Sequence, residues 1–266
     1  MQKLNMFTTE VDYNKLFWDV YKNSSGTAGT FLKAYKDGVY YKASNFDNAR
    51  GFYGHESLNE IIARNLARML KIEHLEYELH YATITVFNKQ YTTFFTGSKN
   101  FRKSNEFKMT LETFYEMYCE SQESIWDFLC RQGWSSYFYD MFLFDWLIYN
   151  RDRHGANIEV LSSSNGTRLA PLFDHGLSFG FSCYEFQGFD DFNKLADNPV
   201  NNYVGSRILS ENLTLVPAAV LHKVDDIQLD QLFIDLDYKE IPNCYFQFIK
   251  SMLQERVDYV KKLPNY

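Results

Sequence analysis

The sequence predicts an α+β fold in two lobes, a small β-rich lobe over residues 1–97 and a mostly helical lobe over residues 98–266. Three observations carry this prediction. Alternating β-prone runs surround one amphipathic run before residue 97, apolar runs at helical spacing follow it, and 45% of all residues are hydrophobic. A chain of 266 residues can bury a sizeable core, so we expect a globular protein.

The first lobe is predicted from two pairs of strands and one helix. Residues 31–44 form two short β-prone runs around Asp37-Gly38, a dipeptide that favours a tight hairpin turn. Residues 56–72 place apolar side chains at helical spacing, and residues 81–88 and 90–97 alternate like paired strands. The lobe is therefore expected to be a sheet with a single long helix.

The second lobe is predicted to be mainly helical. Helices are expected over residues 110–122, 123–133, 135–150 and 243–263. Because residues 135–150 are apolar almost all round, this helix should be buried in the middle of the lobe. Residues 157–161 and 168–174 read as strands around a turn at Asn165-Gly166.

Composition limits the classes of function. The net charge of −7 argues against a general nucleic-acid binder, and the basic run at 99–108 is a solvated loop or a local binding patch. Four scattered cysteines without a C-x-x-C pair indicate reduced thiols in a cytoplasmic protein. The start lacks an apolar signal region, and no run of about 18 apolar residues is long enough to span a membrane.

The stretch YNRDRHGANIEVL, residues 149–161, carries the chemistry. Asp152 lies five residues before Asn157, and Asp174 follows seventeen residues after Asn157, at the end of the next predicted strand. Phosphoryl transfer needs a group that accepts the proton of the attacking hydroxyl and oxygen ligands for Mg²⁺, and this order of residues is the one that protein kinases use. The alternative is a charged loop that caps the buried helix, with Arg151 and Arg153 in solvent.

Upstream residues supply candidate phosphate anchors. The small-residue loop NSSGTAGTFLK, residues 23–33, would let backbone N–H groups approach phosphates. Lys42 ends the next predicted strand, and Glu60 on the helix could orient it, with Glu56 one turn earlier as the alternative. Phe173-Asp174-His175-Gly176 resembles the kinase D-F-G, but His175 could not pack as an apolar residue does.

These motifs resemble those of the HipA-like kinases, including the short CtkA-type members, which share an atypical kinase fold with phosphoinositide kinases. DRHGAN (152–157) is similar to the family's D-x-H-x-x-N, and PLFD (171–174) to its later metal-binding aspartate. SSGTAGTFLK looks like its glycine-rich loop, YYK (40–42) like its nucleotide lysine, and NEIIARNLA like its following helix.

The resemblance implies a two-lobed protein-kinase-like fold that binds ATP and Mg²⁺, with Asp152 as catalytic base and Asn157 and Asp174 as metal ligands. It places the nucleotide against Lys42 and Glu60 and against a hinge at residues 92–101. The implied nucleotide-binding residues of the glycine-rich loop and the hinge are Ser24, Ser25, Gly26, Thr27, Gly29, Phe95 and Ser98. Ser24 or Ser25 is then an expected autophosphorylation site.

His154 is a second candidate catalytic residue. It either contacts the substrate or a phosphate, or braces the loop through a hydrogen bond to the backbone. With about twenty residues before the glycine-rich loop, the sequence lacks the N-terminal subdomain of full-length HipA toxins, which argues against a DNA-binding antitoxin partner.

The sequence favours a protein Ser/Thr kinase and leaves other functions open. A phosphoinositide or small-molecule kinase is the enzymatic alternative, although no basic membrane-facing surface is evident. A catalytically silent pseudokinase that serves as an interaction module is another, and a metal hydrolase using Asp152, His154 and Asp174 is a fourth. The aromatic residues of 176–202 either dock a substrate or pack on the helical lobe. The protein substrate and the oligomeric state are not encoded in any recognisable motif.

Overall fold

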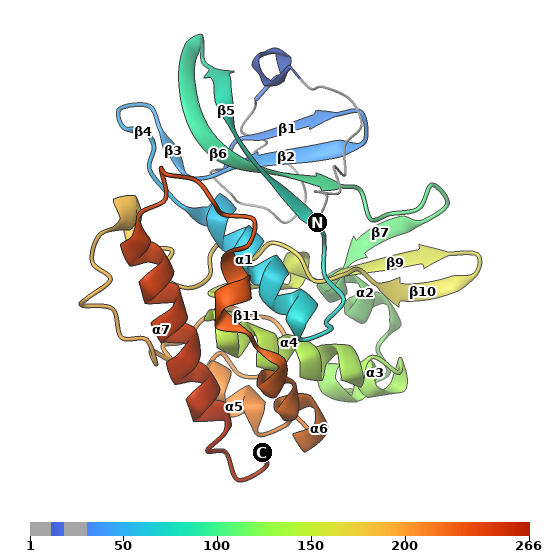
Figure 1. Cartoon of the computed structure of the whole chain (residues 1–266). Helices are drawn as coiled ribbons and strands as arrows, with labels where there is room; N and C mark the ends of the chain where they lie inside the picture. Colours follow the sequence, from blue (N-terminus) through green and yellow to red (C-terminus); the bar gives the residue numbers. More distant parts are fainter. Residues whose placement is uncertain (1–11, 19–30) are drawn as a thin grey trace.

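The computed structural model describes residues 12–18 and 31–266, which form a strand-rich part followed by a helical part (Figure 1). The strands are β1 (Lys33–Lys36), β2 (Val39–Ala43), β3 (Phe46–Asp47), β4 (Gly51–Phe52), β5 (Tyr77–Val86), β6 (Lys89–Lys99), β7 (Phe107–Thr110), β8 (Asp152–Arg153), β9 (Glu159–Ser163), β10 (Gly166–Leu169) and β11 (Asn201–Asn202). The α-helices are α1 (Glu56–Met69), α2 (Leu111–Tyr118), α3 (Ile125–Arg131), α4 (Ser135–Ile148), α5 (Leu209–Leu213), α6 (Ala218–Leu221) and α7 (Asn243–Val260). The 3₁₀ turns are η1 (Tyr13–Lys15), η2 (Gly155–Asn157), η3 (Tyr184–Phe186), η4 (His222–Asp226) and η5 (Leu229–Phe233).

The largest sheet has the antiparallel order β1-β2-β6-β5. Asp37 and Gly38 connect β1 to β2 with φ angles of 52° and 82°, as a hairpin turn with two left-handed residues requires, so the predicted turn is confirmed. The second hairpin turns at Phe87 and Asn88, with φ angles of 48° and 64°. The sequence prediction was wrong here, because it continued the first strand through both turn residues and began that strand at residue 81.

Helix α1 lies between this sheet and the helical part (Figure 1). It is buried on nearly every side, and its apolar residues belong to the larger of two hydrophobic clusters, together with those of α4 and α7. Asn65 donates to the Leu232 carbonyl over 2.7 Å, and Tyr245 Oη on α7 donates to Asn59 Oδ1 over 2.7 Å. Both bonds fix the helix to the helical part, and Ser57 Oγ donates to the Phe94 carbonyl on β6 over 3.4 Å, which ties it to the sheet.

The predicted buried helix is confirmed as α4. Its second half is fully enclosed, and the buried residues are Phe138, Met141, Phe142, Leu143, Phe144, Asp145, Trp146, Leu147 and Ile148. Tyr149 ends the helix in the left-handed conformation, with φ 50°, and turns the chain into the loop that carries Asp152. The one buried carboxylate among these residues, Asp145, faces that loop's Arg153.

A smaller antiparallel sheet, in the order β10-β9-β7, follows this loop. Ser163 pairs with Gly166, so the hairpin turns at residues 164–165, one position before the predicted Asn165-Gly166. Strand β10 ends at Leu169, and residues 170–174 are irregular apart from a bridge between His74 and Leu172. The expectation that Asp174 ends a strand over 168–174 was therefore wrong.

Two expectations from composition concern the cysteines and membrane segments. Cys119, Cys130, Cys183 and Cys244 are all free thiols, as the spacing predicts. Among the residues that the structure describes, none of the helices combines the length and the apolar character that crossing a bilayer requires.

Candidate active site

Lys42 reaches the site because β2 alternates its side chains between the two faces of the sheet. Val39, Tyr41 and Ala43 are buried in the smaller hydrophobic cluster on one face, which leaves Lys42 on the other. There its Nζ donates to Asp174 Oδ1 and lies 3.4 Å from Glu60 Oε1. Residues from a strand, a helix and a loop thus meet at one ammonium group.

Glu60, rather than Glu56, is the partner of Lys42. The Glu60 side chain is 1% exposed, and its Oε2 accepts from the His175 backbone N–H over 2.9 Å. Glu56 instead accepts from the backbone N–H and the side-chain amide of Asn45, over 3.1 and 2.6 Å. Helix α1 therefore holds Lys42 and the backbone next to Asp174 through one carboxylate.

The opposite charges of Lys42 and Asp174 each keep the other group ionised despite burial. Burial lowers the pKa of Lys42, but the Asp174 and Glu60 carboxylates outweigh burial and raise that pKa above its ordinary value. Burial raises the pKa of Asp174, but the Lys42 ammonium prevails and lowers it to about 2. Burial also raises the pKa of Glu60. Lys42 is therefore charged and Asp174 ionised at neutral pH.

Asp174 adopts a left-handed conformation with φ 60°, which aspartate tolerates better than most residues. Its backbone N–H donates to Tyr77 Oη on β5 over 3.1 Å. The sequence analysis missed Tyr77, because a tyrosine that begins a strand carries no signal for a contact with a loop about a hundred residues later.

Arg153 joins the Asp152 loop to the Asp174 loop. Its guanidinium is bound on one side by Asp145, with Nε–Oδ2 3.0 Å and Nη2–Oδ1 2.8 Å, and donates to the Phe173 carbonyl over 2.9 Å. The side chain is 1% exposed, so the alternative in which Arg153 is solvated does not hold. A buried, bidentate pair of this kind fixes geometry at both ends.

His175 packs in a way the sequence did not reveal. It is buried with its ring edge-on to Phe144, at a centroid distance of 5.0 Å, and its Nδ1 lies 3.1 Å from Arg153 Nη2. Because Arg153 donates, His175 Nδ1 accepts. Burial, and then the positive charge of Arg153, hold the pKa of His175 well below its usual range, so the ring is neutral. A neutral histidine fills this position in the core while still anchoring the loop.

Asp152 and His154 project from the loop after α4. Asp152 Oδ1 accepts from Asn201 Nδ2 over 2.7 Å, and Asp152 Oδ2 lies 3.6 Å from His154 Nε2. His154 Nδ1 accepts from the Ala156 backbone N–H over 3.1 Å, so this histidine does brace the loop. Asp152 remains partly exposed. A catalytic base would need this exposure to meet an acceptor molecule.

Asn157 is the second candidate metal ligand after Asp174. Its side-chain amide donates to the Asp152 carbonyl over 2.8 Å, and its Oδ1 is buried without a hydrogen-bond partner. A buried amide oxygen without a partner fits a ligand role, and amide and carboxylate oxygens are the donors that Mg²⁺ prefers. Among the described residues no cluster of three or more His, Cys, Asp or Glu could hold a metal ion.

The remaining predicted residues divide into three groups. Ser98 pairs with Tyr40 and Tyr77 and so lies on the sheet face of Lys42. Phe95 pairs with Ala43 on the opposite face, buried against Trp18 and Tyr41, so the structure does not bring its side chain to the site. Ser24, Ser25, Gly26, Thr27 and Gly29 lie outside the described residues.

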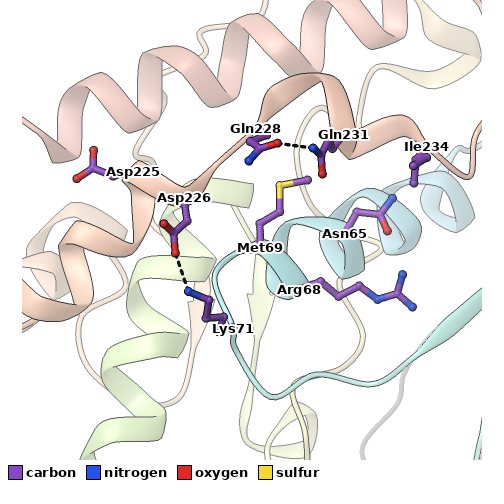
Figure 2. Close-up of a pocket in the computed structure, with 9 residues that line it drawn as sticks. All are labelled: Asn65, Arg68, Met69, Lys71, Asp225, Asp226, Gln228, Gln231 and Ile234. Carbon is purple, nitrogen blue, oxygen red and sulfur yellow. Dashed lines mark hydrogen bonds and ion pairs between the residues drawn. The ribbon is translucent and has the colours of Figure 1, made fainter.

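A separate pocket of about 580 Å³ lies between α1 and residues 225–234 (Figure 2). Asn65, Arg68 and Met69 line it from the helix, and Lys71 forms an ion pair of 3.0 Å with Asp226 across it. None of its lining residues belongs to the site around Lys42 and Asp152. The pocket therefore borders the same helix as the candidate site but is distinct from it.

Comparison with known proteins places the fold. No protein-family model and no curated protein sequence matches the chain. Among solved structures, the Helicobacter pylori proinflammatory kinase CtkA matches with a TM-score of 0.59 at 16% identity, over 86% of this chain and 92% of that one. HipA from Shewanella oneidensis MR-1, solved with HipB and its operator DNA, matches with a TM-score of 0.51 at 16% identity, over 92% of this chain and 68% of that one. The chain shares the mixed α/β fold of these two proteins.

Proposed function

We propose that the chain is an ATP- and Mg²⁺-dependent phosphotransferase, a Ser/Thr protein kinase capable of autophosphorylation. One observation carries the proposal: Lys42 contacts both Glu60 and Asp174, and Arg153 ties Asp174's loop to the loop that holds Asp152 and Asn157. The fold shared with CtkA and HipA supports a kinase. We further propose a two-lobed arrangement divided between residues 97 and 98, a cytoplasmic location, and a protein rather than a nucleic acid as partner.

Each residue has a role in this proposal. Lys42 binds the nucleotide phosphates, and Glu60 on α1 orients Lys42. Asp174 and Asn157 hold Mg²⁺, which when bound neutralises charge on the transferring phosphoryl group. Asp152 accepts the proton of the attacking serine or threonine hydroxyl as the phosphoryl group is transferred from ATP, leaving ADP and a phosphoester. Arg153 contributes no chemistry and keeps the two loops in register.

The test is transfer of label from γ-labelled ATP with Mg²⁺ to the protein itself, compared between wild type, Asp174→Ala and the surface control Asp226→Ala. Asp226 is exposed and pairs only with Lys71 among the contacts described. We expect label on a hydroxyl in wild type and the control but not in Asp174→Ala, with Ser24 and Ser25 as the proposed sites located by mass spectrometry.

Other outcomes separate the remaining functions. ATP binding without transfer to protein, together with transfer to a phosphoinositide or a small-molecule alcohol, would replace the protein acceptor by that class. ATP binding without transfer to any acceptor would make the chain a pseudokinase. Absence of ATP binding in wild-type protein would refute the phosphotransferase altogether.

A further inference from the structure

Strand β11 returns to the candidate catalytic loop from a distant part of the chain. It pairs in parallel with β8, so that Asn201 is opposite Asp152 and Asn202 is opposite Arg153. The Asn201 N–H donates to the Arg151 carbonyl over 3.0 Å, and the Tyr203 N–H to the Arg153 carbonyl over 3.0 Å. The backbone on both sides of Asp152 is thus hydrogen-bonded to residues 201–203.

The side chain of Asn201 adds a contact to the Asp152 carboxylate itself. Asn201 Nδ2 lies 2.7 Å from Asp152 Oδ1, which is a short hydrogen bond from an amide to a charged acceptor. Among the described residues, the other side chain recorded next to this carboxylate is His154, whose Nε2 lies 3.6 Å from Oδ2, beyond hydrogen-bond distance. Asn201 is therefore the group that fixes the rotation of the carboxylate.

We propose that Asn201 is a positioning residue for Asp152, a role that rests on the proposed phosphotransferase function. By occupying Oδ1, the amide leaves Oδ2 to accept the proton of the acceptor hydroxyl. A base misplaced by about 1 Å can cost ~100-fold in rate, so holding the carboxylate in one orientation contributes to turnover without touching the substrate. The same bond couples Asp152 to the conformation of the segment that follows residue 176.

The backbone contacts make this role separable from folding. Val200 and Arg207 are linked through two hydrogen bonds, from the Val200 N–H to the Arg207 carbonyl and from Arg207 Nε to the Val200 carbonyl, both 2.9 Å. Replacing the exposed Asn201 side chain leaves these bonds and the β11–β8 pairing in place. Only the carboxylate then loses its amide donor.

Asn202 provides a matched control. It is the same residue type in the same strand, but its amide donates to the Ser206 carbonyl over 2.9 Å and does not contact Asp152. Asn202→Leu therefore perturbs the segment without removing the contact to the carboxylate. Asn201→Leu removes the donor at nearly constant size, and Asn201→Gln keeps it at an exposed position with room for one more methylene.

The experiment measures ADP release from Mg·ATP, with water as the acceptor, and Mg·ATP affinity by calorimetry for wild type and the three variants. We expect kcat of Asn201→Leu to fall by ~10–100-fold, with KM for ATP and the ATP affinity within about twofold of wild type. Asn201→Gln should recover most of the rate, and Asn202→Leu should retain it. Thermal unfolding of each variant checks that all are folded, and Asn201→Ala, which also lacks a donor, replaces Asn201→Leu if that variant is not.

The outcomes distinguish this inference from the function on which it rests. If wild type turns over ATP and Asn201→Leu matches it, or if Asn202→Leu loses as much as Asn201→Leu, the positioning role is refuted and the kinase proposal stands. A loss of ATP affinity in Asn201→Leu also refutes it, because Asp152 faces the acceptor. If wild type neither binds nor hydrolyses Mg·ATP, the proposed function fails and the inference fails with it.

Discussion

Arg153 and Asp145 form a bidentate ion pair in which both side chains are buried. Asp145→Ala leaves the Arg153 charge in the core without its partner, so we expect the free energy of unfolding to fall by about 3–5 kcal/mol. Denaturant titration measures this change. Asp226→Ala, which breaks an exposed pair with Lys71, should cost less than about 1 kcal/mol. If the free energy of unfolding fell equally in Asp145→Ala and Asp226→Ala, burial would not set the strength of the Arg153–Asp145 pair.

Lys42→Met should weaken Mg·ATP binding. Loss of a charge-assisted contact to phosphate corresponds to about 1.5–3 kcal/mol, or roughly 10–100-fold in affinity. Lys89→Met, at the exposed start of β6, is the control for removing a lysine from the same sheet. Calorimetric titration with Mg·ATP compares them, and an unchanged affinity in Lys42→Met would remove Lys42 from the nucleotide site.

Asp152→Asn should slow phosphoryl transfer by ~100-fold or more while nucleotide affinity stays close to that of wild type, because the base contacts the acceptor hydroxyl. The amide still fits between Asn201 and His154, so the fold should not change. Single-turnover transfer and ATP binding are measured on the same preparation. Normal turnover in this variant would show that another group accepts the proton.

Stability should fall in mild acid because His55 is buried as a neutral ring. Its Nε2 lies 3.2 Å from the Gly180 carbonyl, it stacks on Phe186, and burial lowers its pKa to about 4. The unfolded chain takes up this proton near pH 6.5 and the folded chain only near pH 4. The stability that the neutral His55 ring contributes to the fold is therefore complete above about pH 6.5 and is lost as the pH falls toward 4.

For this one group the loss between pH 7 and pH 5 is about 2 kcal/mol. The difference between the denaturant midpoints at pH 7 and pH 5 should be smaller in His55→Gln than in wild type. The exposed His222 provides the control, since His222→Gln should leave the difference as in wild type. If His55→Gln loses as much stability between pH 7 and pH 5 as wild type does, other groups cause the acid sensitivity.

Local chemistry explains what the sequence predicted well. Asp37-Gly38 prefers the left-handed turn that it adopts, and the apolar run at 135–150 has no polar face to leave in solvent. Lys42 and Glu60 could be proposed together because a strand lysine and a helix glutamate are a recurrent pair in phosphate sites, and the structure places them 3.4 Å apart.

Long-range contacts explain what the sequence could not predict. A shift of one residue moves a strand side chain to the opposite face, so Phe95 could not be assigned a side without the pairing of β6 with β2. Arg153 looks like a loop arginine until Asp145 is known to face it. Nothing near Asn201 in the sequence points to Asp152, 49 residues earlier, and only the pairing of β11 with β8 brings them together.

The attachment of α1 to α7 has a consequence for biosynthesis. The helix that carries Glu60 is held by Tyr245, which is 186 residues downstream of Asn59. At ~5–20 residues per second, a ribosome needs about 10–40 s to make that stretch. During this interval the apolar surface of α1 has no partner from α7, so a nascent chain should bind chaperones and acquire its complete site only after residue 245 has been made.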